Sequence, residues 1–242
     1  GHEQLVLEHC PSCGSTDIKY RGRGTQRIEK ELTNITGSDG IIRMDADTTG
    51  AHDAHYRLLE EFRTGPAPLL LGTQMVAKGL DFPDVTLVGI ISADSSLYIP
   101  DFRAGERTFQ LITQVAGRAG RHSLPGTVIL QTFNPDHFAV EAALNHDYAA
   151  FVTEELEQRS VVGFPPFSRL ILIEVSDRSH AAAEDHATRI ADYLTEYAPD
   201  GVEVLGPADA PIARVRGKSR VHILLKISAG MSRAIALVRH II

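Results

Sequence analysis

Several features that would place the chain in a common class of protein are missing from its 242 residues. Cysteine occurs only at Cys10 and Cys13, and two neighbouring cysteines cannot form the framework of a disulfide-stabilised secreted domain. No apolar run approaches the roughly 20 residues that span a bilayer, and no signal peptide opens the chain. Internal repeats and low-complexity tracts are absent as well. We therefore expect a cytoplasmic location and no membrane partner.

An excess of positive charge is also missing. The formal net charge is −7 at pH 7, which argues against a protein coated in basic surface. A local basic groove can still act within an acidic total, so nucleic acid remains a possible partner. Hydrophobic residues make up 43% of the chain and charged residues 23%, a balance that is ordinary for a globular protein. The length allows one large domain or two modest ones.

Strands and helices alternate from residue 25 to residue 160. Apolar patterning predicts strands at 41–44, 69–71, 86–91 and 127–131. Helices are predicted from Thr25, which we expect to cap the first of them, and over 56–62, 108–115 and 147–159. Continuous apolar strands separated by helices are typical of a parallel sheet with helices on both faces. We predict an α/β domain over residues 25–160.

The pattern restarts after Pro165 and Pro166, two prolines that forbid helix and mark a boundary. The order is then strand 170–175, helix 181–197, strands 202–205 and 221–227, and helix 232–242. This βαββα order is a split βαβ unit without its last strand. We predict a smaller C-terminal α+β domain over residues 161–242, and a separate segment over residues 1–24 that carries the two cysteines.

The segment "QVAGRAGR", residues 114–121, sets two arginines three positions apart among small residues. Gly117 and Gly120 let the backbone pack closely, so that Arg118 and Arg121 can point into a cleft. Arginine grips phosphate oxygens in two places and can stabilise the charge that spreads over a γ-phosphate during transfer. The alternative is a solvated pair at the end of a helix, and composition alone leaves both interpretations open.

A second segment, "LLLGTQMVAKGLDFPDV" at residues 69–85, lies upstream of the arginine pair. Its strand is predicted to end at Gly72, after which backbone amides and the Thr73 hydroxyl can meet a phosphate backbone. The turn that follows presents Asp81, whose carboxylate suits the hydroxyls of a ribose. Taken singly, Asp81 is more typical of a turn or a helix cap.

Together the two segments resemble motifs V and VI of superfamily 2 helicases, in the second RecA-like lobe. "IIRMDADTT" at residues 41–49 is similar to the preceding motif IV region of one family, the primosomal replication-restart helicases, or primosomal protein N′ (PriA) family. Four further stretches resemble that family, in the family's order: "CPSCGSTDIKYRGRGTQRIEKEL", "DFRAGERTFQLITQVAGRAGR", "FPPFSRLILI" and "VLGPADAPIARVRGKSRVHILLKI". The resemblance covers nearly the whole chain and extends well beyond a generic helicase lobe.

The resemblance implies roles at matching positions. Arg118 and Arg121 match the motif VI arginines that reach the ATP phosphates, and Gln114 opens that motif. Gly79 and Asp81 match the motif V positions that approach the nucleotide ribose. We therefore expect ATP with Mg²⁺ to be bound by the intact protein.

The same resemblance implies contacts to DNA. Thr73 and Gln74 match motif V contacts to single-stranded DNA, with Lys78 a weaker candidate. Arg103 and Arg107 lie on the "DFRAGER" segment, where they either couple the lobe to DNA or form surface salt bridges. The sequence leaves these two alternatives equal.

A phosphate-cradling loop of the pattern Gly-x-x-x-x-Gly-Lys-Ser/Thr does not occur in this chain. The only Gly-Lys-Ser, at residues 217–219, has Ile212 where the first glycine belongs, and it precedes a strand. The basic residues of this stretch form a loop suited to DNA phosphates: Arg214, Arg216, Lys218 and Arg220. An ordinary solvated turn is the alternative.

The sequence Cys10-Pro-Ser-Cys13-Gly14 is typical of a zinc knuckle, whose turn lets two thiolates face one tetrahedral ion. Two ligands make only half of a structural site, which needs four. The resembled family has further cysteine pairs, so we expect Zn²⁺ in the intact protein and a half-site here. A redox-active pair is disfavoured, because no thioredoxin-like βαβ context surrounds it.

Taken together, these resemblances imply part of an ATP-dependent DNA helicase that acts at stalled forks and helps restart replication by primosome assembly. The chain begins Gly1-His2, like a cloning remnant, and ends inside a predicted helix, so we expect truncation at both ends. By resemblance, its partners are forked or single-stranded DNA, the single-stranded DNA-binding protein and other primosome proteins, in the bacterial cytoplasm at the nucleoid. This chain alone should not hydrolyse ATP. The alternative is a non-enzymatic module that binds fork DNA or a partner on a helicase-like scaffold.

Overall fold

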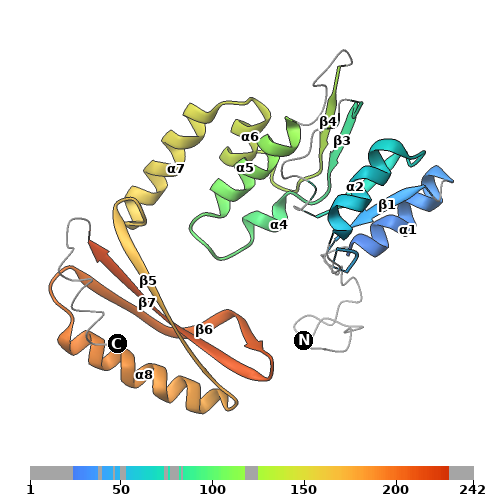
Figure 1. Ribbon diagram of the computed structural model, residues 1–242. Coiled ribbons are helices and arrows are strands. Elements are labelled where there is room, and N and C mark those ends of the chain that lie inside the picture. The colour runs from blue at the N-terminus through green and yellow to red at the C-terminus, as the bar shows by residue number, and fades with distance from the viewer. Residues whose placement is uncertain are drawn as a thin grey trace, which may run out of the picture. The chain divides into compact units, whose positions relative to one another are not determined.

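The computed structural model describes residues 24–37, 40–45, 47–49, 53–73, 76, 82, 84–117 and 125–228. The chain divides into two compact units, with the division between Phe151 and Val152. We call Asp17–Phe151 the N-terminal unit and the part from Val152 the C-terminal unit (Figure 1). The division falls within a helix, and the boundary predicted from the sequence, between residues 160 and 161, lies near the end of that helix.

The N-terminal unit is built from short parallel strands and helices. Its elements are α1 (Thr25–Thr36), β1 (Ile41–Met44), α2 (Ala54–Thr64), β2 (Leu69–Gly72), β3 (Leu87–Ile90), α4 (Asp94–Leu97), α5 (Ala104–Ala116), β4 (Thr127–Leu130) and α6 (Phe138–Leu144). Helix α7 (Tyr148–Val162) follows. β1 pairs in parallel with β2, and β3 pairs in parallel with β4. The prediction of an α/β unit with parallel strands is confirmed.

Helix α1 begins differently from the sequence prediction, and helix α6 was not predicted. Thr25 is the first residue of α1 rather than its cap; the N-cap is Gly24, without a side-chain hydrogen bond. The Thr25 hydroxyl instead donates to the carboxylate of Asp45, which lies beyond the next strand. Helix α6 has only 7 residues, too few for a clear helical pattern in the sequence. Its cap is the ring of His137, whose Nδ1 accepts from the Ala139 amide at 3.1 Å.

Aromatic rings join three helices of the N-terminal unit. Phe109 of α5 is stacked on Phe151 of α7, with 4.3 Å between ring centroids, and Phe138 of α6 is stacked on the same ring at 5.9 Å. Stacked aromatic pairs add to the free energy gained from area burial alone. The small side chains of α6, such as the buried Ala139 and Ala143, allow this helix to pack closely against α5.

The C-terminal unit is an antiparallel sheet with one helix against it (Figure 1). Its strands are β5 (Ser168–Asp177), β6 (Val202–Val215) and β7 (Lys218–Ser228), and α8 (His180–Tyr197) connects β5 to β6. The spatial order is β5-β7-β6, with β7 antiparallel to both neighbours. β5 and β6 are therefore parallel strands separated by β7, which confirms the predicted split βαβ unit. The helix predicted over 232–242 lies outside the described residues.

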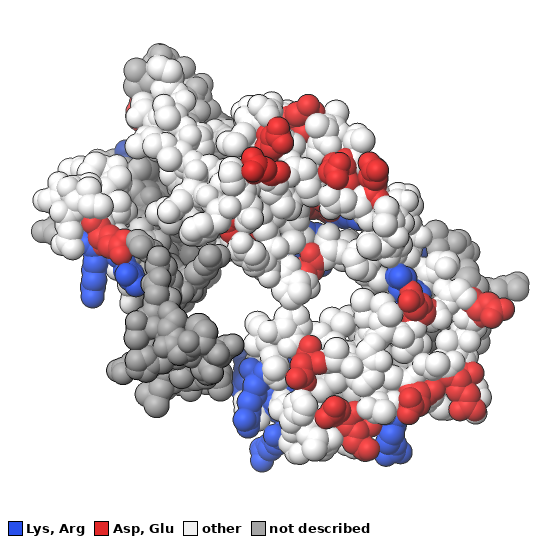
Figure 2. Space-filling model, turned by 180° about the vertical axis from the view of Figure 1, so that it is seen from behind, with Lys and Arg blue, Asp and Glu red and all other residues white. Residues whose placement is uncertain are grey.

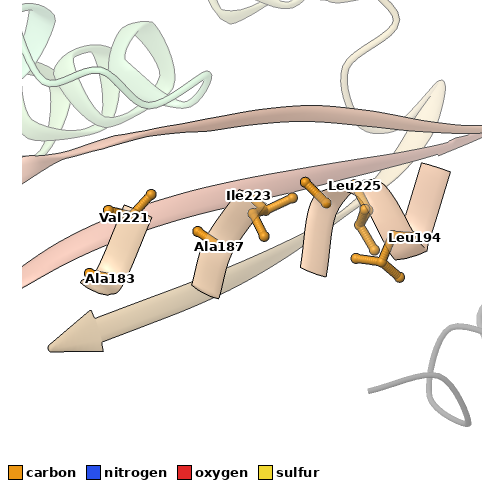
Figure 3. Close-up of a cluster of buried hydrophobic side chains, with 7 residues drawn as sticks. Ala183, Ala187, Leu194, Val221, Ile223 and Leu225 are labelled. Carbon is orange, nitrogen blue, oxygen red and sulfur yellow. The ribbon is translucent and has the colours of Figure 1, made fainter. Parts of the chain in front are cut away.

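The core of the C-terminal unit lies between α8 and β7. Four buried side chains of α8 recur at helical spacing, Ala183, Ala187, Ala191 and Leu194, and face alternate side chains of β7, Val221, Ile223 and Leu225 (Figure 3). Alternation along β7 and the three-to-four-residue spacing along α8 are the two periods that bury one face of each element. Three alanines on α8 bring the helix close to the sheet, which fixes the sheet that carries the β6–β7 hairpin.

Candidate nucleotide and nucleic-acid sites

The described residues contain part of the predicted sites. Thr73, Gln114, Arg214, Arg216, Lys218 and Arg220 are described. The other predicted site residues lie outside the described residues: Cys10, Cys13, Gln74, Lys78, Gly79, Asp81, Arg118 and Arg121. For these, the assignments remain predictions from the sequence.

Gly72 and Thr73 lie at the carboxyl end of β2. Gly72 is opposite Met44 of β1, and a Cβ at Gly72 would lie 2.7 Å from the Met44 carbonyl oxygen and 2.0 Å from Cγ2 of Val76. Only glycine fits there, because the Met44 carbonyl and the Val76 side chain approach so closely. The Val76 amide donates to the Thr73 carbonyl at 3.0 Å, and the Thr73 side chain is exposed. An exposed hydroxyl at the carboxyl end of a parallel strand can contact a phosphate.

Asp45 organises the adjacent carboxyl end of β1 and is 5% exposed. Its carboxylate accepts from the Thr25 hydroxyl and from the amides of Asp47 and Thr48, both at 3.1 Å, and Nε of Arg43 lies 3.1 Å away. The hydrogen bond from Thr25 is the main cause that lowers the pKa of Asp45, and it outweighs the opposite effect of burial. Since Met44 is opposite Gly72, this network fixes the loop beside Thr73.

Asp94 plays the same part at the carboxyl ends of β3 and β4, and it is 2% exposed. It accepts from the Thr132 hydroxyl at 2.9 Å, the Phe133 amide at 3.0 Å and the Asn134 side-chain amide at 2.9 Å. Burial alone would raise the pKa of Asp94, but these three hydrogen bonds together lower it. The carboxylate joins the segment after β3 to the segment after β4, nearly 40 residues further along the chain.

Helix α5 carries one predicted site residue near its C-terminal end, and a set of ion pairs lies around its N-terminal end. Gln114 is half-buried in the last turn of α5. At the other end, Asp101 accepts from Nε of Arg103 at 3.1 Å and pairs with Nη2 of Arg107 at 2.8 Å. The Arg103 hydrogen bond is the main cause that lowers the pKa of Asp101. Of the two alternatives for these arginines, the geometry favours the surface salt bridges.

The predicted basic loop is a tight hairpin turn between β6 and β7. Val215 pairs with Lys218, so only Arg216 and Gly217 connect the strands, with φ of 50° and 77°. Two residues with positive φ are the signature of the type I′ turn that suits a twisted hairpin. Arg214, Arg216 and Lys218 are exposed. Figure 2 shows blue side chains gathered at this end of the C-terminal unit, while red side chains predominate over α8.

Arg220 differs from the other three basic residues of the hairpin. Its guanidinium donates to the Glu174 carboxylate on β5 and, at 3.3 Å, to the Ile212 carbonyl on β6. His222 Nε2 lies 3.3 Å from the same carboxylate. The Arg220 hydrogen bond is the main cause that lowers the pKa of Glu174. Arg220 remains a predicted DNA contact, but in the structure it links all three strands at the base of the hairpin.

Two organising carboxylates, Asp45 and Asp94, received no role in the sequence analysis. Asp45 follows the predicted strand 41–44 by one residue, and Asp94 follows the predicted strand 86–91 by three. Side chains from neighbouring parallel strands meet at this position, which is the signal that could have identified them. Among the described residues, no group of three or more histidine, cysteine or acidic side chains could hold a metal ion. No helix in the same part of the chain has both the length and the apolar character needed to cross a membrane.

Comparison with known proteins gives two family matches. Residues 22–123 match the helicase conserved C-terminal domain, and residues 160–241 match the primosomal protein N C-terminal domain. The chain is 48% identical over 226 residues to the replication restart protein PriA of Bacillus subtilis, covering 93% of this chain and 28% of that protein. It is 42% identical over 225 residues to the PriA of Synechocystis (93% and 27%), and 44% identical over 226 residues to that of Treponema pallidum (93% and 34%). The chain thus spans about a third or less of the length of these relatives.

Proposed function

Because the chain belongs to the family of the replication restart protein PriA, we propose that it is part of an ATP-dependent DNA helicase that acts at stalled forks and helps assemble the primosome. The observation that carries the proposal is the co-occurrence of the two family matches in one chain, a helicase C-terminal domain followed by a primosomal C-terminal domain. The first match contains "GTQMVAKGLDF" and "QVAGRAGR", the segments with the residue types that ATP and DNA require.

For ATP, the donor set of the chain suits a nucleotide. Arg118 and Arg121 carry permanent charge for the phosphate oxygens, and Asp81 has the acceptor oxygens that ribose hydroxyls need. Gln114, half-buried at the end of α5, leads directly into the arginine segment. ATP with Mg²⁺, when bound, supplies the phosphoryl group whose transfer drives movement of the two helicase lobes. Arg118 and Arg121 of this chain would stabilise the negative charge on the phosphates during that transfer. A phosphate-cradling loop would be contributed by another part of the parent protein.

For DNA, the proposal uses the exposed Thr73 at the end of β2 and the exposed basic residues of the β6–β7 hairpin. Asp45 and Asp94 act as positioning residues, because they fix the loops at the strand ends without facing solvent. Cys10 and Cys13 would contribute two thiolates to a zinc site that further cysteines of the parent complete. The single-stranded DNA-binding protein and other primosome proteins are the proposed partners, and the bacterial nucleoid is the proposed location.

The test is DNA-stimulated ATP hydrolysis by the full parent protein, with Arg121→Ala compared with the unaltered chain. Loss of an arginine that stabilises the transition state is expected to lower turnover on the order of 10³-fold or more. Arg63→Ala, an exposed arginine on α2 paired with Glu60, is the matched control and should keep full turnover. Fork binding by all three proteins shows whether each is folded.

If Arg121→Ala abolishes hydrolysis while fork binding survives, the motor function is supported. If the variant and the unaltered protein hydrolyse ATP alike, or if neither does, the motor proposal fails. Fork binding without hydrolysis would then favour the alternative of a non-enzymatic binding module. The 242-residue chain by itself is expected to hydrolyse no ATP.

A further inference from the structure

The β6–β7 hairpin extends beyond the part of the sheet that α8 covers. On β6, Ala210 is the last buried residue, and every residue from 211 to 218 is exposed. On β7, burial begins again at Ser219, which lies on the same face of the strand as the core residue Val221. The end of the hairpin is therefore a two-stranded ribbon with solvent on both faces.

The positive charges of this ribbon lie on both of its faces. Between Ala210 and Val221 the chain has four basic residues and no acidic residue. Arg214 is opposite Ser219, and the next position, Val215, is opposite Lys218. Because successive side chains of a strand alternate between faces and directly opposite residues share a face, Arg214 and Lys218 extend on opposite faces.

The ribbon is also held in one conformation. Arg216 and Gly217 form the two-residue turn at its tip, and the Arg214 guanidinium donates to the Gly217 carbonyl at 3.4 Å. At the base, Arg220 joins the Glu174 carboxylate of β5 to the Ile212 carbonyl of β6. The pairing between Asp209 and Arg214 is irregular, with a bulge on β6, and Arg220 spans this bulge. The basic tip is thus attached to the sheet by a contact that crosses all three strands.

Aromatic side chains are missing from the same stretch, since residues 210–221 contain no Phe, Tyr, Trp or His. Proteins that bind single strands without sequence preference combine a basic groove with aromatic rings on which bases stack. The hairpin offers charge but no stacking surface. Its chemistry suits a nucleic acid whose bases are already paired and whose phosphates lie on two sides.

We propose that the β6–β7 hairpin enters the major groove of duplex DNA as a two-stranded ribbon, with Arg214 and Lys218 directed at the phosphates of the two opposite walls and Arg216 at the tip. The major groove is about 12 Å wide and admits a ribbon of two strands spaced about 4.8 Å apart. The inference rests on the proposed function, because it assigns one DNA form to a hairpin already predicted to bind DNA. It makes the duplex arm of a fork, rather than its single strand, the partner of this hairpin.

The experiment compares the 242-residue chain with a triple variant, R214Q/R216Q/K218Q, on two fluorescent probes: a 25-base-pair duplex and a 25-nucleotide oligo-dT strand. Loss of two phosphate contacts and of the charge at the tip should weaken duplex binding on the order of 100-fold at roughly 0.1 M salt, and should reduce the slope of log K against log salt by at least about 1.8. Oligo-dT binding should change less than about twofold, because the proposal assigns these three residues no contact with a single strand. Methyl green, which occupies the major groove, should compete with the unaltered chain, and netropsin, a minor-groove ligand, should not.

Arg189→Gln, an exposed arginine on α8, is the matched control for loss of one charge in the same unit and should leave both probes bound as before. Circular dichroism of every variant checks that the sheet remains folded. Equal loss on duplex and oligo-dT would overturn the groove assignment while leaving DNA binding by the hairpin intact. No loss on either probe would remove the hairpin from the DNA site. Neither of these results affects the ATPase test with Arg121→Ala, so failure here and failure of the proposed function are separable.

Discussion

The two units of the molecule place their functional chemistry differently. In the N-terminal unit, Thr73 and the positioning residues Asp45 and Asp94 follow the carboxyl ends of parallel strands, and Asp94 reaches partners after β4 that are nearly 40 residues distant. In the C-terminal unit, the candidate residues lie on one hairpin within seven consecutive positions, from Arg214 to Arg220. A parallel sheet collects its site from distant segments, because its strands require long crossovers, whereas an antiparallel hairpin presents a site from one stretch.

Carboxylates also serve opposite purposes in the two units. Asp94 is almost fully buried and accepts from three uncharged donors, so it holds the segment after β3 to the segment after β4. Glu174 is partly exposed and engages the charged side chain of Arg220 and the imidazole ring of His222. Removing a buried acceptor leaves its donors without partners, whereas removing one member of an exposed ion pair returns the other to water. The N-terminal network should therefore be the more sensitive to mutation.

The largest expected effect is that of Asp94→Ala. Three donors would lose their acceptor, and we expect local destabilisation of up to about 3 kcal/mol, from about 1 kcal/mol for each of the three hydrogen bonds to the buried carboxylate. Hydrogen exchange measured by mass spectrometry on the whole chain should show peptides of β3 and β4 exchanging roughly 100-fold faster. Peptides of β5 and β7 should keep their protection.

Asp136→Ala removes an exposed carboxylate from the same unit and should leave exchange unchanged. Equal loss of protection in β5 and β7 would mean that the units are not independent, which would contradict the division between Phe151 and Val152. Unchanged exchange in β3 and β4 would show that the Asp94 network does not hold the strand ends together.

A smaller effect distinguishes two glycines. Gly72→Ala places a Cβ 2.0 Å from Cγ2 of Val76 and 2.7 Å from the Met44 carbonyl oxygen, so we expect a cost of about 2 kcal/mol from overpacking. Gly217→Ala meets no atom within 4 Å, and its cost of about 1 kcal/mol comes only from the φ of 77°. Urea denaturation of each variant, with exchange data to locate the change, measures both.

A larger loss of stability for Gly217→Ala than for Gly72→Ala would contradict this comparison. Gly217→Asn provides the matched control, since asparagine tolerates positive φ better than alanine and should recover part of the lost stability. Gly72→Asn, which keeps the steric conflict, should recover none. Recovery at both positions would show that the conformation of the backbone, rather than space, decides the requirement at Gly72.

The smallest expected effect is an opposite pH response of His180 in the C-terminal unit and of Asp45 and Asp94 in the N-terminal unit. The hydrogen bond from His180 to Asp209, 2.7 Å long, is the main cause that raises the pKa of His180, and the charges of Asp209 and Glu184 add to it. A raised histidine pKa stabilises the folded state below the ordinary value of 6.5 and loses this contribution as pH rises through the folded value. The lowered pKa values of Asp45 and Asp94 act in the other direction: their contribution is present above 3.8 and is lost as pH falls through the folded values.

Nuclear magnetic resonance titration of the His180 ring measures the first half of this prediction, and Asp209→Asn is expected to move the pKa of His180 back toward 6.5. Acid titration from pH 5 to pH 2, followed by the signals of β3 and β4, measures the second half. A pKa of His180 unaffected by Asp209→Asn would contradict the link between α8 and β6. Loosening of β3 and β4 above pH 5 would contradict the role of the buried carboxylates.

Local patterns in the sequence predicted most of the elements correctly. The strands of both units, helices α1, α2, α5, α7 and α8, and the split βαβ order are confirmed, but β6 was predicted too short: it continues past residue 205 to Val215, so Arg214 of the predicted basic loop lies on a strand. Each depends on apolar periodicity or on a turn, which neighbouring residues encode. The assignment of Thr25 as the helix cap was wrong. A threonine at the start of a helix is typical of a cap, but the sequence does not show which acceptor or donor its hydroxyl binds. That hydroxyl binds Asp45, 20 residues away.

By itself, the sequence determined the alternation of strands and helices, the proline pair that precedes β5, and the charge of the β6–β7 hairpin, because these depend on residues close together in the chain. Only the tertiary structure decided which charges are already engaged. Arg220 belongs to the basic stretch by sequence, yet it is bound to Glu174, 46 residues earlier, while Arg103 and Arg107 are paired with Asp101. Strand register and side-chain contacts select such partners, and the alternating pattern that predicts a strand carries no information about the strand that will lie beside it.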